Sequence, residues 1–272
     1  MSTPIIESTN SPPVSITWLV RGFCWYTRRM IRKQFYAFAM DDSDASEQQI
    51  ALAKPIIFFC NHPGWWDPIV TMQVCQRFYP DRVFYAPIDQ IAIEKYSVFS
   101  KLGFFGVALD QREGVVAFLK QTQSIMKASG SSLWITPEGR FSDTRDVSAN
   151  WMPGLAHLAK QYPGAICIPM AIEYPFIDEA KPLMLCKIGK SIEASSLLSM
   201  SKNDCSSYLK SQLCQTQKSL ANSVMTRSFE SFKVIVQASQ TPKNLYDWCR
   251  WMVCKVTGRK FELNHGKNVL AS

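Results

Sequence analysis

Six short apolar runs that alternate with segments of helical periodicity are the strongest constraint on how this chain folds. The runs span residues 55–60, 83–87, 104–109, 131–136, 165–172 and 183–188, and helical patterns at 68–79, 90–101, 113–128 and 154–161 lie between several of them. Strands that alternate with helices predict a sheet with helices on its faces. We therefore expect an α/β protein with a single domain over residues 50–240, built on a mixed, largely parallel sheet flanked by helices.

The segments around these runs are more polar. Residues 1–13 are rich in Ser, Thr and Pro, which predicts a disordered tail, and the acidic segment 41–47 predicts a solvated loop or linker. A long polar helix is expected at about 203–226, followed by a strand or a further helix at 229–238.

Almost all of the net positive charge lies in two segments near the chain ends. Residues 14–36 contain five basic residues and no acidic one, and residues 243–260 contain five basic residues and one acidic one, within a chain of net charge +8. Both segments also carry Trp at helical spacing, but neither has the uninterrupted apolar length of a transmembrane helix. We predict basic amphipathic helices at 14–40 and 243–260 that bind a membrane surface, or alternatively pack on the core.

Composition narrows the class of protein further. No recognisable DNA- or RNA-binding motif accompanies the basic segments, so a nucleic-acid partner is not expected. Nine scattered cysteines, several of them inside apolar runs, indicate reduced thiols in a cytosolic compartment. Together with the two basic segments, they predict a protein attached peripherally or monotopically to the cytoplasmic face of a membrane. Three widely separated histidines do not predict a metal site, and no cofactor is expected.

The octapeptide NHPGWWDP at residues 61–68 follows directly on the first apolar run and places His62 five positions before Asp67. A strand that ends in a loop is a common place for catalytic groups in α/β proteins. If Asp67 binds one ring nitrogen of His62, it fixes the tautomer and leaves the other nitrogen free to take a proton. The alternative is a histidine with a purely structural role in a turn.

Three further polar clusters lie at or within the strand-like runs. Arg112 opens a helix after the run 104–109, and its guanidinium suits a phosphate oxygen. In the turn TPEGRFS at 136–142, Gly139 allows Glu138 and Arg140 to project into one space. Pro169 lies inside the run 165–172, which indicates an edge strand or a substrate-lined groove. Each cluster alone also fits an ordinary structural role.

The order of these motifs resembles the glycerolipid acyltransferase family of the lysophosphatidate acyltransferase type. Four motifs follow one another over roughly residues 50–190: NHxxxxD, G-x5-R, a PEG turn and an I-P strand. The residues within these motifs resemble a bacterial lysophospholipid acyltransferase-like branch. The resemblance implies that His62 and Asp67 are the catalytic pair. It also implies that Arg112, Glu138 and Gly139 hold the phosphate of the acceptor, and that Pro169 belongs to the fourth motif.

The chain departs from the family pattern in two places. Leu109, Asp110 and Gln111 precede Arg112 where an aromatic and a branched residue are usual. In the third motif Phe141 occupies the position of the family arginine, and the cation stands one residue earlier, as Arg140. Adjacent side chains of an extended turn point in different directions. The departure therefore leaves open whether the acceptor carries a phosphate.

The chemistry expected from the pair is direct acyl transfer. His62 would remove the proton of a lipid hydroxyl as it attacks an acyl thioester, while Asp67 stabilises the imidazolium. The resemblance implies acyl-CoA or acyl-carrier protein as donor and a lysolipid as acceptor, 1-acylglycerol-3-phosphate or a related lysophospholipid. No GxSxG motif is present, and Cys60 is more easily explained as core than as nucleophile.

Three alternatives stay open at this point. The same reaction could use a non-phosphate acceptor, such as an amino-acid lipid or a glycosylated terpenoid. The chain could instead be a membrane-binding homologue without catalytic activity. A hydrolase that uses the His-Asp pair on a metal is the third, and the scarcity of histidine disfavours it.

Overall fold

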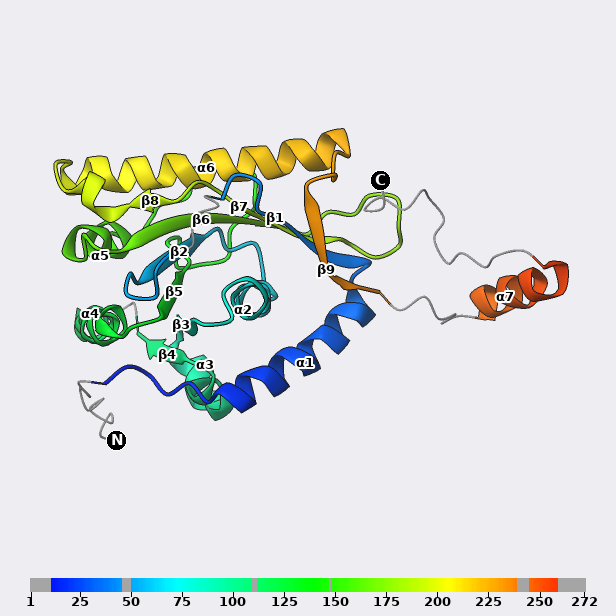
Figure 1. Ribbon diagram of the computed structural model, residues 1–272, viewed down its shortest axis with the longest axis horizontal. Helices are drawn as coiled ribbons and strands as arrows, with labels where there is room; N and C mark the ends of the chain where they lie inside the picture. Colours follow the sequence, from blue (N-terminus) through cyan, green and yellow to red (C-terminus); the bar gives the residue numbers. More distant parts are fainter. Residues whose placement is uncertain (1–10, 46–49, 109–111, 147, 239–244, 259–272) are drawn as a thin grey trace.

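In the part of the chain that the structure describes, nine strands form one sheet at the centre (Figure 1). The computed structural model describes residues 11–45, 50–108, 112–146, 148–238 and 245–258. The strand order is β4-β3-β5-β2-β6-β7-β1-β9, with β8 paired to β6. The strands are β1 (Ala37–Asp41), β2 (Ile56–Cys60), β3 (Val83–Asp89), β4 (Phe104–Val107), β5 (Ser131–Ile135), β6 (Ile166–Glu173), β7 (Met184–Ile188), β8 (Ile192–Glu193) and β9 (Phe232–Gln237).

Helices cover both faces of this sheet (Figure 1). The helices are α1 (Thr17–Gln34), α2 (Asp67–Phe78), α3 (Gln90–Lys95), α4 (Arg112–Lys127), α5 (Gly154–Gln161), α6 (Lys202–Thr226) and α7 (Leu245–Thr257), with 3-10 turns η1 (Ser97–Lys101) and η2 (Ala194–Leu197). The pairings β2–β5, β2–β6, β3–β4, β3–β5 and β1–β7 are parallel, and those of β6 with β7 and β8 and of β1 with β9 are antiparallel. The predicted α/β architecture is confirmed.

The alternation of side chains along β2 shows how the core is divided. Ile56, Phe58 and Cys60 belong to a cluster that includes buried residues of α1 and α2, whereas Ile57 and Phe59 belong to one that includes buried residues of α4, α5 and α6. Successive side chains of a strand point to opposite faces, so a continuous apolar run is what a strand buried on both faces requires. The run 56–60 thus fixes β2 in the interior of the sheet.

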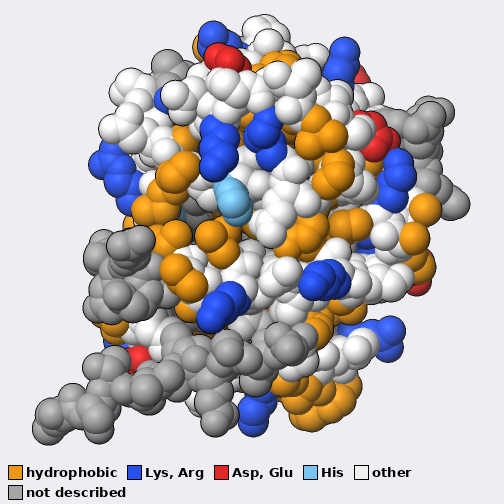
Figure 2. All heavy atoms as spheres, turned by 90° about the vertical axis from the view of Figure 1, so that its left-hand side faces the viewer, with side chains coloured by type: hydrophobic (Ala, Val, Ile, Leu, Met, Phe, Trp, Pro, Cys, Tyr) orange, Lys and Arg blue, Asp and Glu red, His pale blue; other side chains and the backbone are white. Residues whose placement is uncertain are grey.

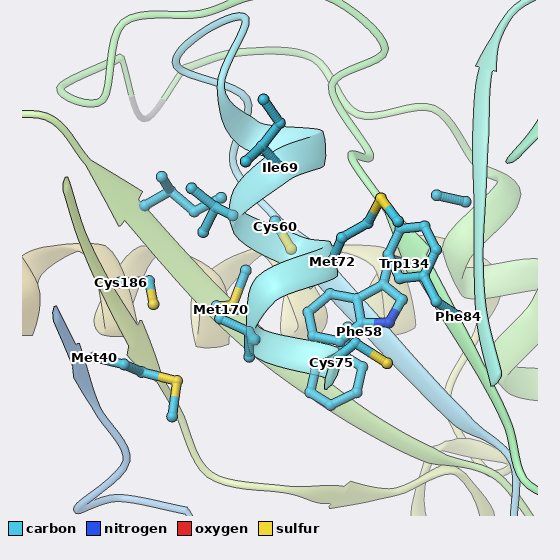
Figure 3. Packing of buried hydrophobic residues seen from close by; sticks show 14 of the residues in the cluster. Met40, Phe58, Cys60, Ile69, Met72, Cys75, Phe84, Trp134, Met170 and Cys186 are labelled. Atoms are coloured by element: carbon cyan, nitrogen blue, oxygen red, sulfur yellow. The ribbon is translucent and has the colours of Figure 1, made fainter. Parts of the chain in front are cut away.

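Helix α2 is held on its face of the sheet by aromatic and sulfur-containing side chains (Figure 3). The rings of Phe58 and Trp134 stack with their centroids 3.8 Å apart and their planes at 8°. The indole N–H of Trp134 donates to Ser132 Oγ at 3.1 Å, which satisfies the polar atom of this buried side chain. Met72 and Cys75 of α2 lie in the same cluster (Figure 3). This packing fixes the helix whose first turn contains Asp67.

The structure departs from the expected elements at both edges of the sheet. Residues 37–41 form strand β1, not part of a helix over 14–40, because the chain becomes extended at Phe35 and then pairs with β7 and β9. Residues 232–237 form β9, which decides between the two possibilities for 229–238. The expected helix at 90–101 is divided into α3 and η1 at Tyr96. The predicted disordered tail falls largely on residues 1–10, which lie outside the described residues, as does part of the predicted loop 41–47.

The two basic helices are present, with α1 at Thr17–Gln34 and α7 at Leu245–Thr257. None of the helices in the described ranges has the length and apolarity needed to cross a bilayer. The apolar stripe of α1 faces the protein, because Cys24 and Ile31 are fully buried. Its other face is exposed and carries Trp18, Trp25 and Tyr26.

A buried ion pair fastens β1 to β7. Lys187 Nζ lies 2.6 Å from Asp41 Oδ2 and 3.0 Å from Asp44 Oδ2, and the side chains of Lys187 and Asp41 are almost inaccessible. Burial alone would raise the pKa of Asp41, but hydrogen bonds from Lys187 and Ser43 outweigh it and lower the pKa below the ordinary 3.8. The same carboxylates outweigh the opposite effect of burial on Lys187 and raise its pKa.

We predict that Asp41→Asn lowers the free energy of unfolding by about 3 kcal/mol at neutral pH, because it leaves a buried ammonium short of one partner. Because the pKa of Asp41 is lowered in the folded state, its contribution is present above pH 3.8 and is lost as the pH falls through the folded value. Denaturant unfolding of the wild-type and Asp41→Asn proteins at neutral and acidic pH measures the difference in their free energies of unfolding. This difference should become smaller in acid.

Asp178→Asn is the matched control, since Asp178 pairs with Arg227 at 2.6 Å on the exposed surface. An exposed pair contributes about 0–1 kcal/mol. Equal losses of stability in the two variants would contradict the role assigned to the buried pair.

Candidate active site

The site lies where three parallel strands end at the same edge of the sheet. Strand β2 is paired in parallel with β5 on one side and with β6 on the other. The carboxyl ends of parallel strands meet at one edge, and loops at that edge commonly carry functional groups. Here β2 leads into the loop that contains His62, β5 into the loop that contains Glu138, and β6 into Tyr174.

Asn61 fastens the first loop to the neighbouring strand. Its side-chain amide donates to the carbonyl oxygen of Ile172 at 2.9 Å, and its amide oxygen accepts from the backbone N–H of Ile172 at 2.8 Å. The side chain is buried, so both polar atoms need these partners. The residue directly before His62 is thereby fixed to β6.

His62 and Asp67 are brought into direct contact. His62 Nδ1 lies 2.6 Å from Asp67 Oδ2, and the same oxygen accepts from the backbone N–H of Gly64 at 3.0 Å. Asp67 is the first residue of α2, with Pro68 directly after it, so the helix start fixes the position of the carboxylate. The side chain of Asp67 is 2% exposed and that of His62 is 20% exposed. With its proton on Nδ1, the imidazole can accept a proton at Nε2.

Tyr174 is a third member of this group, which the sequence analysis missed. Its hydroxyl donates to Asp67 Oδ1 at 2.5 Å, so both oxygens of the carboxylate are bound. Burial raises the pKa of Tyr174 well above 10.0, and the charge of Asp67 adds to the effect, so the phenol stays a donor at neutral pH. The available signal was a hydroxyl-bearing aromatic residue two positions after the run 165–172.

The third motif packs its loop against the first. Gly139 adopts φ +64°, and a Cβ atom there would approach Met152 within 2.9 Å, so the turn requires glycine. Glu138 is buried and accepts a hydrogen bond from Ser142 Oγ, while the backbone N–H of Ser142 donates to the carbonyl oxygen of His62 at 3.0 Å. Glu138 thus supports the loop that holds His62.

Phe141 and Arg140 differ in where their side chains lie. The ring of Phe141 lies against the imidazole of His62, with centroids 4.5 Å apart and planes at 52°, and is itself 60% exposed. Arg140 is exposed. The residue at the position of the expected cation therefore covers one side of the histidine with an apolar ring.

The two other predicted binding residues are Arg112 and Pro169. Arg112 is the first residue of α4, but its side chain lies outside the described residues. Pro169 is buried in β6, a central strand, so the expectation of an edge strand is wrong. Its predicted place in a substrate-lined groove stays a prediction.

The register of β6 explains how a central strand accommodates this proline. On the side away from β2, β6 pairs with β8 through Cys167 and with β7 from Met170 onwards. Pro169 lies between these two partners, and its carbonyl oxygen accepts from Gly189 at 2.9 Å. The missing N–H therefore falls where no ladder bond is required.

Cys60 is excluded as a ready nucleophile by its surroundings. The thiol is buried at the end of β2, and burial raises its pKa well above 9.0, with a further contribution from the charge of Asp67. Only a thiolate attacks a thioester efficiently. Cys60 is therefore a packing residue.

A depression of about 360 Å³ lies beside the pair. It is lined by Pro63, the loop 142–145 and residues 173–175, which include Tyr174. Within the loop, Arg145 Nη2 binds Asp143 Oδ2 at 2.7 Å, so this cation has a carboxylate partner. The depression thus borders the residue after His62 and the tyrosine that binds Asp67.

The fold and the site together define an α/β protein with a carboxylate-bound histidine at the carboxyl edge of a largely parallel sheet. Residues 43–173 match the model of the family described as Acyltransferase, so this region is an acyltransferase domain of the glycerolipid and lysophosphatidate acyltransferase family. The family supports acyl transfer to lipid acceptors in general. A search of curated proteins found no match to the chain.

We predict that Tyr174→Phe lowers kcat about tenfold with little change in KM, because one oxygen of a buried carboxylate loses a donor that is worth about 1–2 kcal/mol. Steady-state kinetics of acyl transfer and thermal unfolding of the same preparations measure the two effects. Tyr162→Phe is the control, since the buried hydroxyl of Tyr162 has no hydrogen-bond partner among the described residues. A Tyr174→Phe enzyme as active as the Tyr162→Phe enzyme would show that the contact with Asp67 is dispensable.

Proposed function

We propose that this protein is an O-acyltransferase that moves a fatty acyl group from an acyl thioester to a hydroxyl of a lysolipid. The observation that carries the proposal is the 2.6 Å contact between His62 and Asp67, within an acyltransferase-family domain. The donor is acyl-CoA or acyl-carrier protein. The acceptor is 1-acylglycerol-3-phosphate or a related lysophospholipid.

In the proposed reaction His62 acts as general base. Nε2 takes the proton of the acceptor hydroxyl as its oxygen attacks the thioester carbonyl, and the imidazolium forms against the buried carboxylate of Asp67. The carbon–sulfur bond then breaks, and the imidazolium returns the proton to the departing thiolate. The products are an ester and a free thiol, and the histidine is neutral again.

The negative charge on the carbonyl oxygen needs hydrogen-bond donors during this step. Gly64 is not available, because its N–H already donates to Asp67 Oδ2. The backbone N–H groups of Trp65 and Trp66 precede the first turn of α2 and have no acceptor among the described residues. The positive end of the helix dipole lies there as well, which favours an anion at this position.

The contact between Phe141 and His62 favours a second candidate, the same reaction on a lipid acceptor without a phosphate. An apolar ring 4.5 Å from the imidazole replaces the expected cation next to the reacting hydroxyl. An amino-acid lipid or a glycosylated terpenoid would require no cation there. The phosphate-bearing acceptor depends on Arg140 and Arg112 instead.

The exposed face of α1 supports a peripheral position at the cytoplasmic face of a membrane. Trp18 and Trp25 are 73% and 60% exposed, and the guanidinium of Arg29 lies 4.9 Å from the ring centroid of Trp25. Aromatic rings with basic neighbours suit the interface of an anionic bilayer. Hydrophobic and basic side chains also intermingle on the face seen in Figure 2, where acidic side chains are sparse.

We predict that His62→Ala lowers kcat by about 10²–10⁴-fold, the usual contribution of a positioned general base. The assay follows a labelled acyl thioester into lipid product with purified protein. His157→Gln is the control, since His157 lies on α5 and outside the sequence motifs that contain His62, Glu138 and Pro169. Unchanged lipid turnover in the His62→Ala protein would contradict the catalytic role of the pair. No turnover even in the wild-type protein with any acceptor would indicate a membrane-binding homologue without activity.

For the acceptor, we predict that Arg140→Gln raises KM for lysophosphatidate about tenfold, because the phosphate loses a charge-assisted hydrogen bond. KM for an uncharged lysolipid should stay the same. Kinetics of the wild-type and Arg140→Gln enzymes with a panel of lysolipids measure these KM values. A wild-type preference for an acceptor without a phosphate would favour the second candidate over the first.

A further inference from the structure

Three arginines line a pocket on the side of the sheet covered by α1 and α2. The pocket measures about 480 Å³ and is lined by Arg21 and Arg28 of α1, by Gln76, Arg77 and Pro80 at the end of α2, and by Ile235 of β9. Figure 1 shows α1 running past α2 towards β9. Residues far apart in the sequence thus meet in one basic recess.

Arg28 is held in place by glutamine side chains. Its Nε donates to Gln73 Oε1 at 2.9 Å, and one terminal nitrogen reaches Gln76 Oε1 at 3.4 Å. Gln73 is fully buried, and its amide nitrogen donates to Cys24 O at 2.7 Å and to Thr27 Oγ1 at 2.8 Å. A buried network therefore orients this guanidinium before any ligand arrives, which reduces the entropy that binding would cost.

The recess carries an uncompensated positive charge. No carboxylate is among its lining residues, and none of the ion pairs in the described part of the chain involves Arg21, Arg28 or Arg77. The C-terminal end of α2 contributes about half a negative charge, which leaves most of the charge of three guanidinium groups. Like charges that share a recess repel one another, and a bound anion would relieve that repulsion.

We propose that this recess binds a phosphate group. Guanidinium groups match phosphate oxygens in pairs of hydrogen bonds, and the amide nitrogen of Gln76 can add a neutral donor because its oxygen faces Arg28. A volume of about 480 Å³ holds a phosphate together with the group that carries it. The phosphate belongs either to a phospholipid headgroup or to a soluble molecule, and the position of Arg21 on the same exposed face of α1 as Trp18 and Trp25 favours the headgroup.

This site is separate from the candidate active site. Arg77 follows Asp67 by ten residues on α2, which places the two about 15 Å apart along the helix axis. A phosphate in the recess is therefore not the acceptor phosphate next to His62. Its function would be to orient the protein on a phosphate-bearing partner, and it does not depend on the catalytic role of the histidine.

The test measures binding of the full chain to two probes. One arm uses phosphatidylcholine vesicles with and without phosphatidylglycerol, and the other uses inorganic phosphate followed by titration calorimetry. Arg21→Gln and Arg77→Gln change exposed side chains, so both variants should fold normally, which thermal unfolding checks. Arg32→Gln is the matched control, because Arg32 is also an exposed arginine of α1 but does not line the recess.

We expect each recess variant to weaken binding to the effective probe about tenfold, whereas the control loses clearly less. A loss with phosphatidylglycerol vesicles alone identifies a lipid headgroup, and a loss with inorganic phosphate identifies a soluble ligand as well. Equal losses in Arg21→Gln, Arg77→Gln and Arg32→Gln, or no loss in either arm, would overturn the proposal. His62→Ala protein should bind like the wild type, so a failure of the catalytic proposal leaves this result unaffected.

Discussion

The buried carboxylate of Asp67 is the group on which the site depends. It is buried and accepts hydrogen bonds from His62, from the backbone of Gly64 and from Tyr174. A buried charge is tolerated only with such partners. Because the partners come from the loop after β2 and from the end of β6, the two strand ends must meet at the first turn of α2. The charge therefore fixes the geometry that a general base needs.

The packing of α2 connects this local requirement with the rest of the protein. Met72 and Cys75 hold the helix on the sheet over the stacked rings of Phe58 and Trp134. Its first residue is Asp67, and its last turn presents Arg77 to the basic recess. One helix thus positions a proposed proton-transfer site at one end and a proposed phosphate site at the other. The two sites therefore lie at opposite ends of the same helix.

The sequence predicted the interior of the fold better than its edges. The strands β2 to β7 were predicted because residues buried on both faces leave continuous apolar runs, as at 56–60. Strand β1 was missed because only two residues separate it from a strongly periodic helix, and only pairing with β7 and β9 makes it a strand. Pro169 suggested an edge strand, because the sequence does not reveal that β6 changes from β8 to β7 as its partner at this proline. Membrane binding by α1 stays a prediction, although the structure shows that its apolar stripe is used by the core and that its exposed aromatics are on the other face.

By itself the sequence determined the α/β class and predicted that Asp67 could bind His62, because strand periodicity and a short loop are local properties of the chain. It also placed Glu138 and Gly139 in a turn near that pair. Only the tertiary structure decided that Tyr174 completes the bonding of Asp67, that Phe141 covers the imidazole, and that Arg21, Arg28 and Arg77 share a recess. These contacts join residues that are up to about a hundred positions apart in the chain. They follow from the strand order and from the way α1 crosses α2. Local sequence patterns predict neither of these two features.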